Sequence, residues 1–117
     1  MKEFLLLIRT EGDYCASLSP QAYASHLQDM GAYINDLEKN GHLIAAKPLK
    51  VEGAILSGNK GVFKDGPYTE SKEVIIGYYH ILAQDIDEAI VIARRNPVFE
   101  CTEAWMEIRP IKQDNKG

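Results

Sequence analysis

The sequence has no long hydrophobic run. Its first apolar stretch, residues 4–8, is far shorter than the roughly 18 residues that a membrane span needs. No small-residue cleavage site follows this stretch, so it does not resemble a signal peptide. We therefore interpret it as a strand, and we expect a cytoplasmic protein that does not contact a membrane.

Cysteine is scarce and basic residues are not clustered. Cys15 and Cys101 lie far apart in the sequence without the spacing of metal ligands, which predicts two free thiols. The net charge of −4 and the scattered Lys and Arg residues argue against nucleic acid as a partner. No P-loop, dinucleotide-binding fingerprint, HExxH motif or nucleophile elbow is present. The sequence therefore predicts no cofactor and no metal.

The length of 117 residues, with 45% hydrophobic and 26% charged residues, suits one soluble domain. We expect the domain to cover residues 1–112, followed by a polar tail over residues 113–117.

Periodicity and turn signals predict the elements of this domain. Ser19 and Pro20 are typical of a helix start, and Asn40 with Gly41 of its end. A stripe at helical spacing lies between them: Tyr23, Leu27, Met30, Ile34 and Leu37. A second helix begins after Asp85, and the segment 11–20 is expected to be a loop. Strands are predicted at 3–9, 42–49, 53–58, 61–66, 74–83 and 103–109.

This order predicts an α+β protein, a ferredoxin-like βαββαβ sandwich with a hairpin insertion. Its helices cover one face of the sheet, whereas residues 3–9 and 74–83 are apolar on both faces. A bare apolar sheet face favours a homodimer that packs two sheets together and leaves a pocket between them. The alternative is a monomer whose insertion folds over the sheet.

A conspicuous motif, "KDGPYTESKE", occupies residues 64–73. Asp65-Gly66-Pro67 is typical of a tight turn that Asp65 holds through its own backbone. If the segment that follows is extended, Tyr68, Glu70 and Lys72 lie on one side. These side chains either surround the mouth of a small-molecule site, contact a second subunit, or are solvated charges.

Two histidines are candidates for proton transfer. His26 lies on the flank of the first helix, with Tyr33 on the same side; it is either a proton acceptor at a pocket edge or a boundary histidine. Strand alternation places His80 on one face with Ile76, Tyr78 and Leu82, where it either enters the pocket between the sheets or packs in a core or interface.

Several of these segments resemble the YCII-related family, in the subgroup named for a DGPF motif: "KDGPYTESKE", "IIGYYHI", "DIDEAI", "EIRP", the start "MKEFLLLIR" and the "LSP" before the first helix. The fourth motif position is Tyr68 here instead of Phe. The resemblance implies a ferredoxin-like dimeric α+β barrel, and most members have no assigned activity.

The wider family also implies a catalytic pair formed by a His on the first helix and an Asp after the second strand. His26 matches the first position, but "KPLKVEG" after the second strand has no Asp, and only Glu52 is near.

Two functions are compatible with these features. The first is an acid–base isomerase or lyase-type enzyme that acts on a small organic molecule. Its candidate catalytic residues are His26, Asp65 and His80, and its candidate substrate-binding residues are Tyr33, Tyr68, Glu70, Lys72, Tyr78 and Trp105. The second is a non-catalytic ligand-binding or regulatory dimer. Fold alone does not decide between them.

Overall fold

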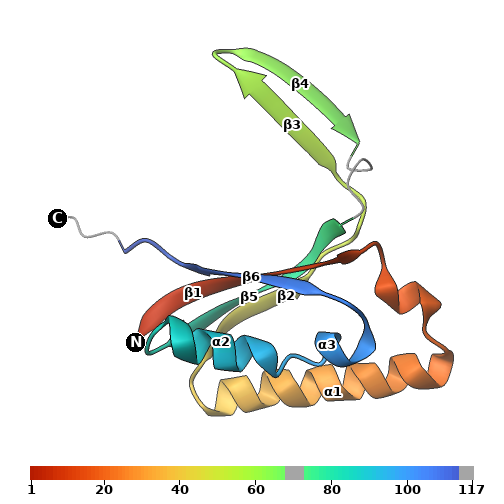
Figure 1. Ribbon diagram of the computed structural model, residues 1–117, viewed down its shortest axis with the longest axis vertical. Coiled ribbons are helices and arrows are strands. Elements are labelled where there is room, and N and C mark those ends of the chain that lie inside the picture. Colours follow the sequence, from red (N-terminus) through yellow and green to blue (C-terminus); the bar gives the residue numbers. More distant parts are fainter. Residues whose placement is uncertain (68–72, 114–117) are drawn as a thin grey trace.

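The computed structural model describes residues 1–67 and 73–113 of the chain. Its elements follow the expected order, with a strand, a helix and a strand on each side of a hairpin (Figure 1). Their bounds are β1 Lys2–Glu11, η1 Tyr14–Ser17, α1 Pro20–Lys39, β2 Leu43–Pro48, β3 Ala54–Asn59, β4 Val62–Pro67, β5 Glu73–Ala83, α2 Ile86–Arg94, α3 Val98–Cys101 and β6 Trp105–Pro110.

The first helix begins and ends where its sequence signals lie. The Ser19 hydroxyl accepts a hydrogen bond from the Ala22 backbone N–H at 3.1 Å, which caps the helix N-terminus. At the other end Gly41 has φ of 74°, the left-handed conformation that glycine adopts without strain. The predicted loop before this helix contains the short η1 helix, which Asp13 caps by accepting from the Cys15 N–H at 3.1 Å.

An antiparallel four-stranded sheet forms the centre of the molecule, in the order β2-β5-β1-β6. All the helices of the described residues lie on one side of it (Figure 1). The α+β class predicted from the sequence is confirmed. Within the residues that the structure describes, no helix is long and apolar enough to span a membrane.

The core lies between the sheet and the helices. Alternate residues of β1 point toward the helices and are buried, because side chains of a strand alternate between its two faces. The buried hydrophobic residues of this cluster are Phe4, Leu6, Ile8, Tyr33, Leu37, Tyr79, Ile81, Ala83, Ala89, Ile92, Ala93 and Val98.

A β-bulge in β5 changes which face one predicted residue occupies. Ile8 is paired with Gly77 and Arg9 with Ile75, so Ile76 is the extra residue between them. Strict alternation predicted Ile76 beside Tyr78; this placement was wrong, because the bulge turns Ile76 toward the helices, where it packs against the core.

The β3–β4 hairpin stands away from the sheet on the side opposite the helices (Figure 1). Lys60 and Gly61 both have positive φ, 52° and 89°, as a two-residue type I′ turn requires. Asp65 and Gly66 lie within β4, and not in a turn as their sequence suggested. Four large apolar side chains in the described part of the hairpin are exposed: Ile55, Leu56, Val62 and Phe63.

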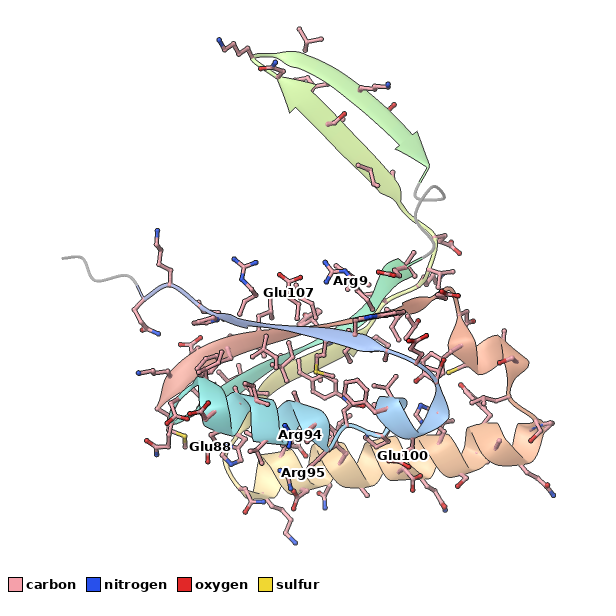
Figure 2. All side chains as sticks on the ribbon, viewed as in Figure 1. Arg9, Glu88, Arg94, Arg95, Glu100 and Glu107 are labelled. Atoms are coloured by element: carbon pink, nitrogen blue, oxygen red, sulfur yellow. The ribbon has the colours of Figure 1, made fainter. Side chains whose placement is uncertain are left out.

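The sheet face that the helices leave bare carries charges among its apolar side chains. Leu5 and Leu7 are half-buried on it, opposite His80 and Tyr78 of β5. On the same face Arg9 and Glu107 form an ion pair at 2.7 Å (Figure 2). The bare face is therefore mixed, and less apolar than the sequence of the strands suggested.

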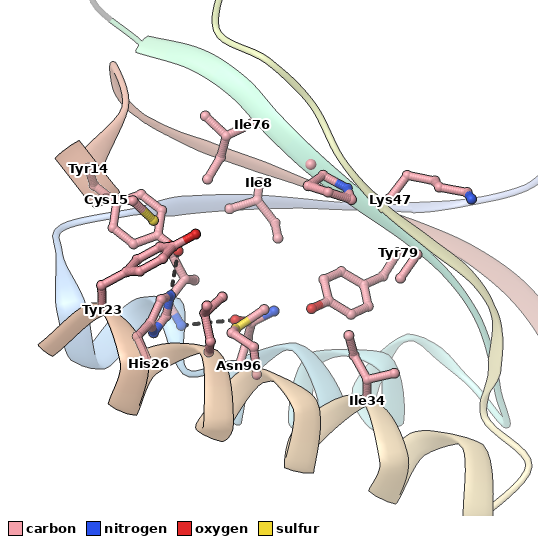
Figure 3. Close-up of a pocket in the computed structure, with 16 residues that line it drawn as sticks. Ile8, Tyr14, Cys15, Tyr23, His26, Ile34, Lys47, Ile76, Tyr79 and Asn96 are labelled. Carbon is pink, nitrogen blue, oxygen red and sulfur yellow. Dashed lines mark hydrogen bonds between the residues drawn. The ribbon is translucent and has the colours of Figure 1, made fainter. Parts of the chain in front are cut away.

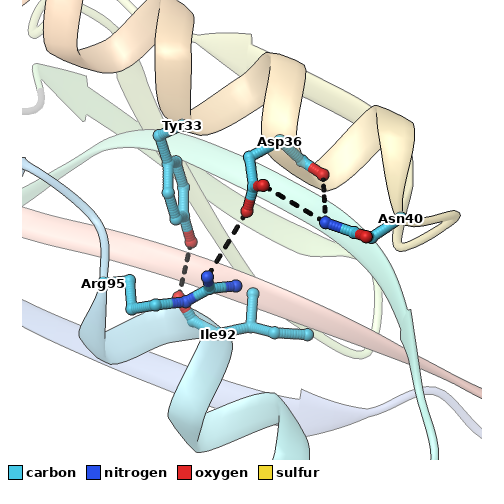
Figure 4. A network of polar contacts seen from close by, with 5 residues as sticks. All are labelled: Tyr33, Asp36, Asn40, Ile92 and Arg95. Carbon is cyan, nitrogen blue, oxygen red and sulfur yellow. Dashed lines mark hydrogen bonds and ion pairs between the residues drawn. The ribbon is translucent and has the colours of Figure 1, made fainter.

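A polar network joins α1 to the end of α2 (Figure 4). The buried Tyr33 hydroxyl donates to the Ile92 carbonyl at 2.7 Å, and Arg95 forms an ion pair with Asp36 at 3.3 Å. Asn40 also donates to the Asp36 carbonyl at 2.9 Å. The contacts of Tyr33 and of Arg95 hold α1 and the end of α2 together.

Candidate functional site

A cavity of about 370 Å³ lies between residues 23–34 of α1 and the sheet (Figure 3). Its walls are mostly apolar, and come from β1, η1, α1, β2, β5, α3 and the segment between α2 and α3. The apolar lining consists of Ile8, Leu27, Met30, Ile34, Ala46, Pro48, Ile76, Gly77 and Val98. A largely apolar cavity with a few polar groups is the usual form of a small-molecule site.

His26 is the central polar group at one end of this cavity. Only 3% of its surface is exposed, and both ring nitrogens have partners. Nε2 lies 2.6 Å from the Tyr14 hydroxyl, and Nδ1 lies 3.1 Å from Cys101 Sγ. The rings of His26 and Tyr14 meet edge to face, with centroids 5.4 Å apart. The histidine is thus held between a phenol and a thiol.

Two short elements, η1 and α3, bring these groups to α1. The η1 helix presents Tyr14 and Cys15 to the cavity, and α3 ends at Cys101. Tyr14 and Cys101 are far apart in sequence, and both reach His26 because the two elements pack against the N-terminal half of α1.

The protonation states of Tyr14 and Cys101 follow from their burial. Burial raises the pKa of Tyr14, and partial burial raises the pKa of Cys101, so both stay protonated near neutrality. A neutral imidazole has one N–H and one lone pair, so in that form His26 accepts a hydrogen bond at one ring nitrogen and donates one at the other. Because a phenol is a stronger donor than a thiol, the short 2.6 Å contact favours Tyr14 donating to Nε2.

A second pair of polar groups lies elsewhere in the cavity wall. Tyr79 is in β5 and Asn96 follows α2, and both are buried. Asn96 Oδ1 accepts from the Val98 N–H at 2.9 Å, whereas its buried Nδ2 has no hydrogen bond of acceptable geometry within the described residues. Burial raises the pKa of Tyr79, and the neighbouring Asn96 amide partly opposes this rise.

The candidate site residues predicted from the sequence lie in different parts of the structure. His26 lines the cavity, and Tyr33 lies in the core beside it with its ring 5.7 Å from that of Tyr79. Tyr78, His80 and Trp105 lie on the bare sheet face, as the strand pairing shows. Asp65 is on the projecting hairpin, and Tyr68, Glu70 and Lys72 lie outside the described residues.

A histidine–carboxylate pair does exist, but not at the cavity. His80 Nε2 lies 2.7 Å from Glu3 Oε1 on the bare sheet face. The cavity lining contains no carboxylate among the residues that the structure describes. At the cavity, the partners of the histidine are therefore a phenol and a thiol.

Sequence reasoning missed Tyr14, Cys101, Tyr79 and Asn96. One signal was available for Tyr14, because Asp13 before "YCAS" is a capping residue that favours a helical turn. No local pattern marks the other three, since their roles depend on contacts across the chain.

No group of three His, Cys, Asp or Glu side chains suited to a metal ion occurs in residues 1–67 and 73–113.

Helices on one side of an antiparallel sheet, with a cavity between them, define an α+β protein with an internal pocket. The YCII-related domain model matches residues 2–114, so the chain belongs to the YCII-related domain family. No curated protein matches the chain.

Proposed function

We propose that this protein binds a small, largely apolar organic molecule in the cavity beneath α1 and exchanges a proton with it. The observation that carries the proposal is His26, buried in the wall of an apolar cavity and bonded to a phenol that lines the same cavity. Buried polar side chains that converge on a cavity are more typical of a ligand site than of a packed core.

Proton transfer in this site uses two side chains. Tyr14 and His26 both line the cavity, and Tyr14 is bonded to Nε2. The Tyr14 oxygen receives a proton from the ligand while its own proton passes to Nε2, and the reverse transfer returns it. This chemistry is that of an isomerase or lyase-type acid–base enzyme.

We also propose that the protein belongs to the DGPF subgroup of the family and that its sheet is ferredoxin-like. We further propose that it forms a homodimer in which the bare sheet faces of two subunits pair as a dimeric barrel. Half-buried Leu5 and Leu7 and the exposed apolar hairpin support an interface, because such surfaces are usually covered. Two free thiols suit a cytoplasmic, reducing compartment.

A second candidate function is non-catalytic ligand binding. It is favoured because both ring nitrogens of His26 already have hydrogen-bond partners in the same chain, Tyr14 and Cys101. A histidine of this kind can shape and stabilise a pocket without exchanging protons.

The test uses phenylnitromethane, a carbon acid with an apolar ring. Binding is followed by amide chemical shifts of the cavity residues, and proton transfer by deuterium incorporation in heavy water. We expect wild-type protein to accelerate exchange and His26→Gln to reduce this acceleration by about 100-fold or more. His42→Gln, a half-buried histidine bonded to the Leu82 carbonyl, is the matched control.

Three results separate the alternatives. Met30→Trp fills the cavity and is expected to abolish binding; unchanged binding would overturn the proposed site. Binding without accelerated exchange would support the non-catalytic function. Loss of exchange in His80→Gln but not in His26→Gln would move the chemistry to the bare sheet face.

A further inference from the structure

The pair formed by Asn96 and Tyr79 indicates what kind of ligand the cavity accepts. Asn96 is 1% exposed, and its Nδ2 is a buried donor without a hydrogen bond of acceptable geometry in the part of the chain that the structure describes. A buried donor without an acceptor is destabilising, so such groups usually have a role.

The orientation of this amide is fixed by the backbone. Oδ1 accepts from the Val98 N–H at 2.9 Å, which holds the side chain with its Nδ2 on the other side. In Figure 3 the amide nitrogen of Asn96 points toward the Tyr79 hydroxyl, although no hydrogen bond of acceptable geometry joins the two within the described residues. Figure 3 shows both side chains in the cavity wall.

The Tyr79 hydroxyl is therefore left as a donor. Because the Asn96 N–H groups face its oxygen, its own hydrogen is free to point into the cavity. Within the described residues the hydroxyl makes no hydrogen bond, in contrast to that of Tyr33, which donates to the Ile92 carbonyl. Both groups at this point of the wall are donors, so their complement is an oxygen acceptor on the ligand.

The other residues that line the cavity indicate which chemical group of the ligand carries this oxygen. Lys47 contributes to the lining, but its amine points away from the space in Figure 3. An unpaired carboxylate in an apolar cavity is far less favourable than a neutral carbonyl. A carbonyl also makes the hydrogens on its neighbouring carbon acidic, which suits the proton transfer proposed for Tyr14 and His26.

We propose that the ligand is a neutral carbonyl compound with an apolar body, whose oxygen accepts a hydrogen bond from Tyr79 while Asn96 orients the tyrosine. This inference rests on the proposed function. When the carbon next to the carbonyl loses its proton through Tyr14 to His26, the electron pair forms a carbon–carbon double bond and the oxygen becomes an enolate. Tyr79 stabilises that oxygen, and return of the proton completes the step without any other reactant.

The test compares acetophenone with ethylbenzene, which has a similar shape but no carbonyl, and with benzoate. Dissociation constants are measured by NMR titration. We expect wild-type protein to bind acetophenone roughly three- to tenfold more tightly than ethylbenzene, and benzoate more weakly than acetophenone. Tyr79→Phe is expected to remove the preference for the ketone and to keep ethylbenzene binding.

Asn96→Asp tests the positioning role. It keeps the acceptor for Val98 but replaces the donor by an oxygen that competes for the Tyr79 hydrogen, so the ketone preference is expected to fall although Tyr79 is present. An unchanged preference in this variant would remove the role of Asn96. Tyr33→Phe, which loses a hydroxyl in the core, is expected to keep the preference.

The outcomes distinguish this inference from the proposed function. If Tyr79→Phe keeps the ketone preference, or if benzoate binds best, the carbonyl assignment is overturned while the cavity remains a ligand site. If the preference depends on Tyr33, recognition of the oxygen belongs to that residue instead. If wild-type protein binds neither acetophenone nor ethylbenzene, the proposed function fails and this inference fails with it.

Discussion

Cys101 Sγ lies 3.1 Å from His26 Nδ1, although the two residues are 75 positions apart in the sequence. This contact ties α3 to α1 and fills one of the two bonding positions of a buried imidazole. Cys101→Ala is therefore expected to destabilise the protein by about 1 kcal/mol, because it leaves a buried nitrogen without a partner. Cys101→Ser, which keeps a hydroxyl at this position, is the control in urea unfolding. Equal stability of the two variants would show that the contact contributes nothing.

Tyr14 and His26 are expected to act as one unit in proton exchange. Tyr14→Phe keeps the ring against His26 but removes the hydroxyl that is 2.6 Å from Nε2. Its effect on deuterium exchange into phenylnitromethane should match that of His26→Gln, and the double variant should be no slower than either single one. Independent, multiplying effects would argue against a relay between the two side chains.

Stability is expected to fall at alkaline pH because Tyr33 and Tyr79 are buried and Tyr14 is half-buried. Burial raises the pKa of Tyr14, Tyr33 and Tyr79 in the folded state. The unfolded chain then loses its phenol protons first, near pH 10, so their stabilising contribution is complete below that pH and is lost as the pH rises further. Urea unfolding between about pH 9 and about pH 11 should show this loss, with a smaller slope in Tyr33→Phe. A flat profile would contradict the burial of these hydroxyls.

Two glycines should respond in opposite directions to alanine. A Cβ at Gly77 would lie 3.2 Å from the Lys47 carbonyl oxygen, where β2 and β5 approach closely. Gly77→Ala is therefore expected to destabilise by about 1 kcal/mol or more. In contrast, a Cβ at Gly31 in α1 meets nothing within 4 Å, so Gly31→Ala should stabilise by about 0.5–1 kcal/mol. Thermal unfolding of both variants measures the difference, and a shift in the same direction would contradict this account of the sheet.

The proposed dimer predicts a specific effect of charge on the bare sheet face. Leu7 is half-buried there, opposite Tyr78 and Glu107. Sedimentation should show a dimer for the wild type and a monomer for Leu7→Lys, with unchanged circular dichroism. Val91→Lys, at an exposed apolar position of α2, should remain dimeric. A monomeric wild type at micromolar concentration would remove the interface from the proposal.

Local sequence signals predicted most of the fold. Ser19, Asp85 and Gly41 act on backbone groups within four residues, so their effect on α1 and α2 was readable from the chain. The turn at Lys60 and Gly61 is local in the same way. The bulge at Ile76 was not predicted, because it depends on how β5 pairs with β1 and not on the residues of β5 alone.

The candidate site was also predictable from the sequence only in part. The sequence by itself determined that His26 lies on the first helix, that the two cysteines are free thiols, and that the strands have apolar faces. Only the tertiary structure decided that a phenol from η1 and a thiol from α3 meet this histidine, and that Asn96 faces Tyr79. The physical reason is distance along the chain: caps, turns and periodicity arise between near neighbours, whereas a cavity arises where elements remote in sequence pack against each other.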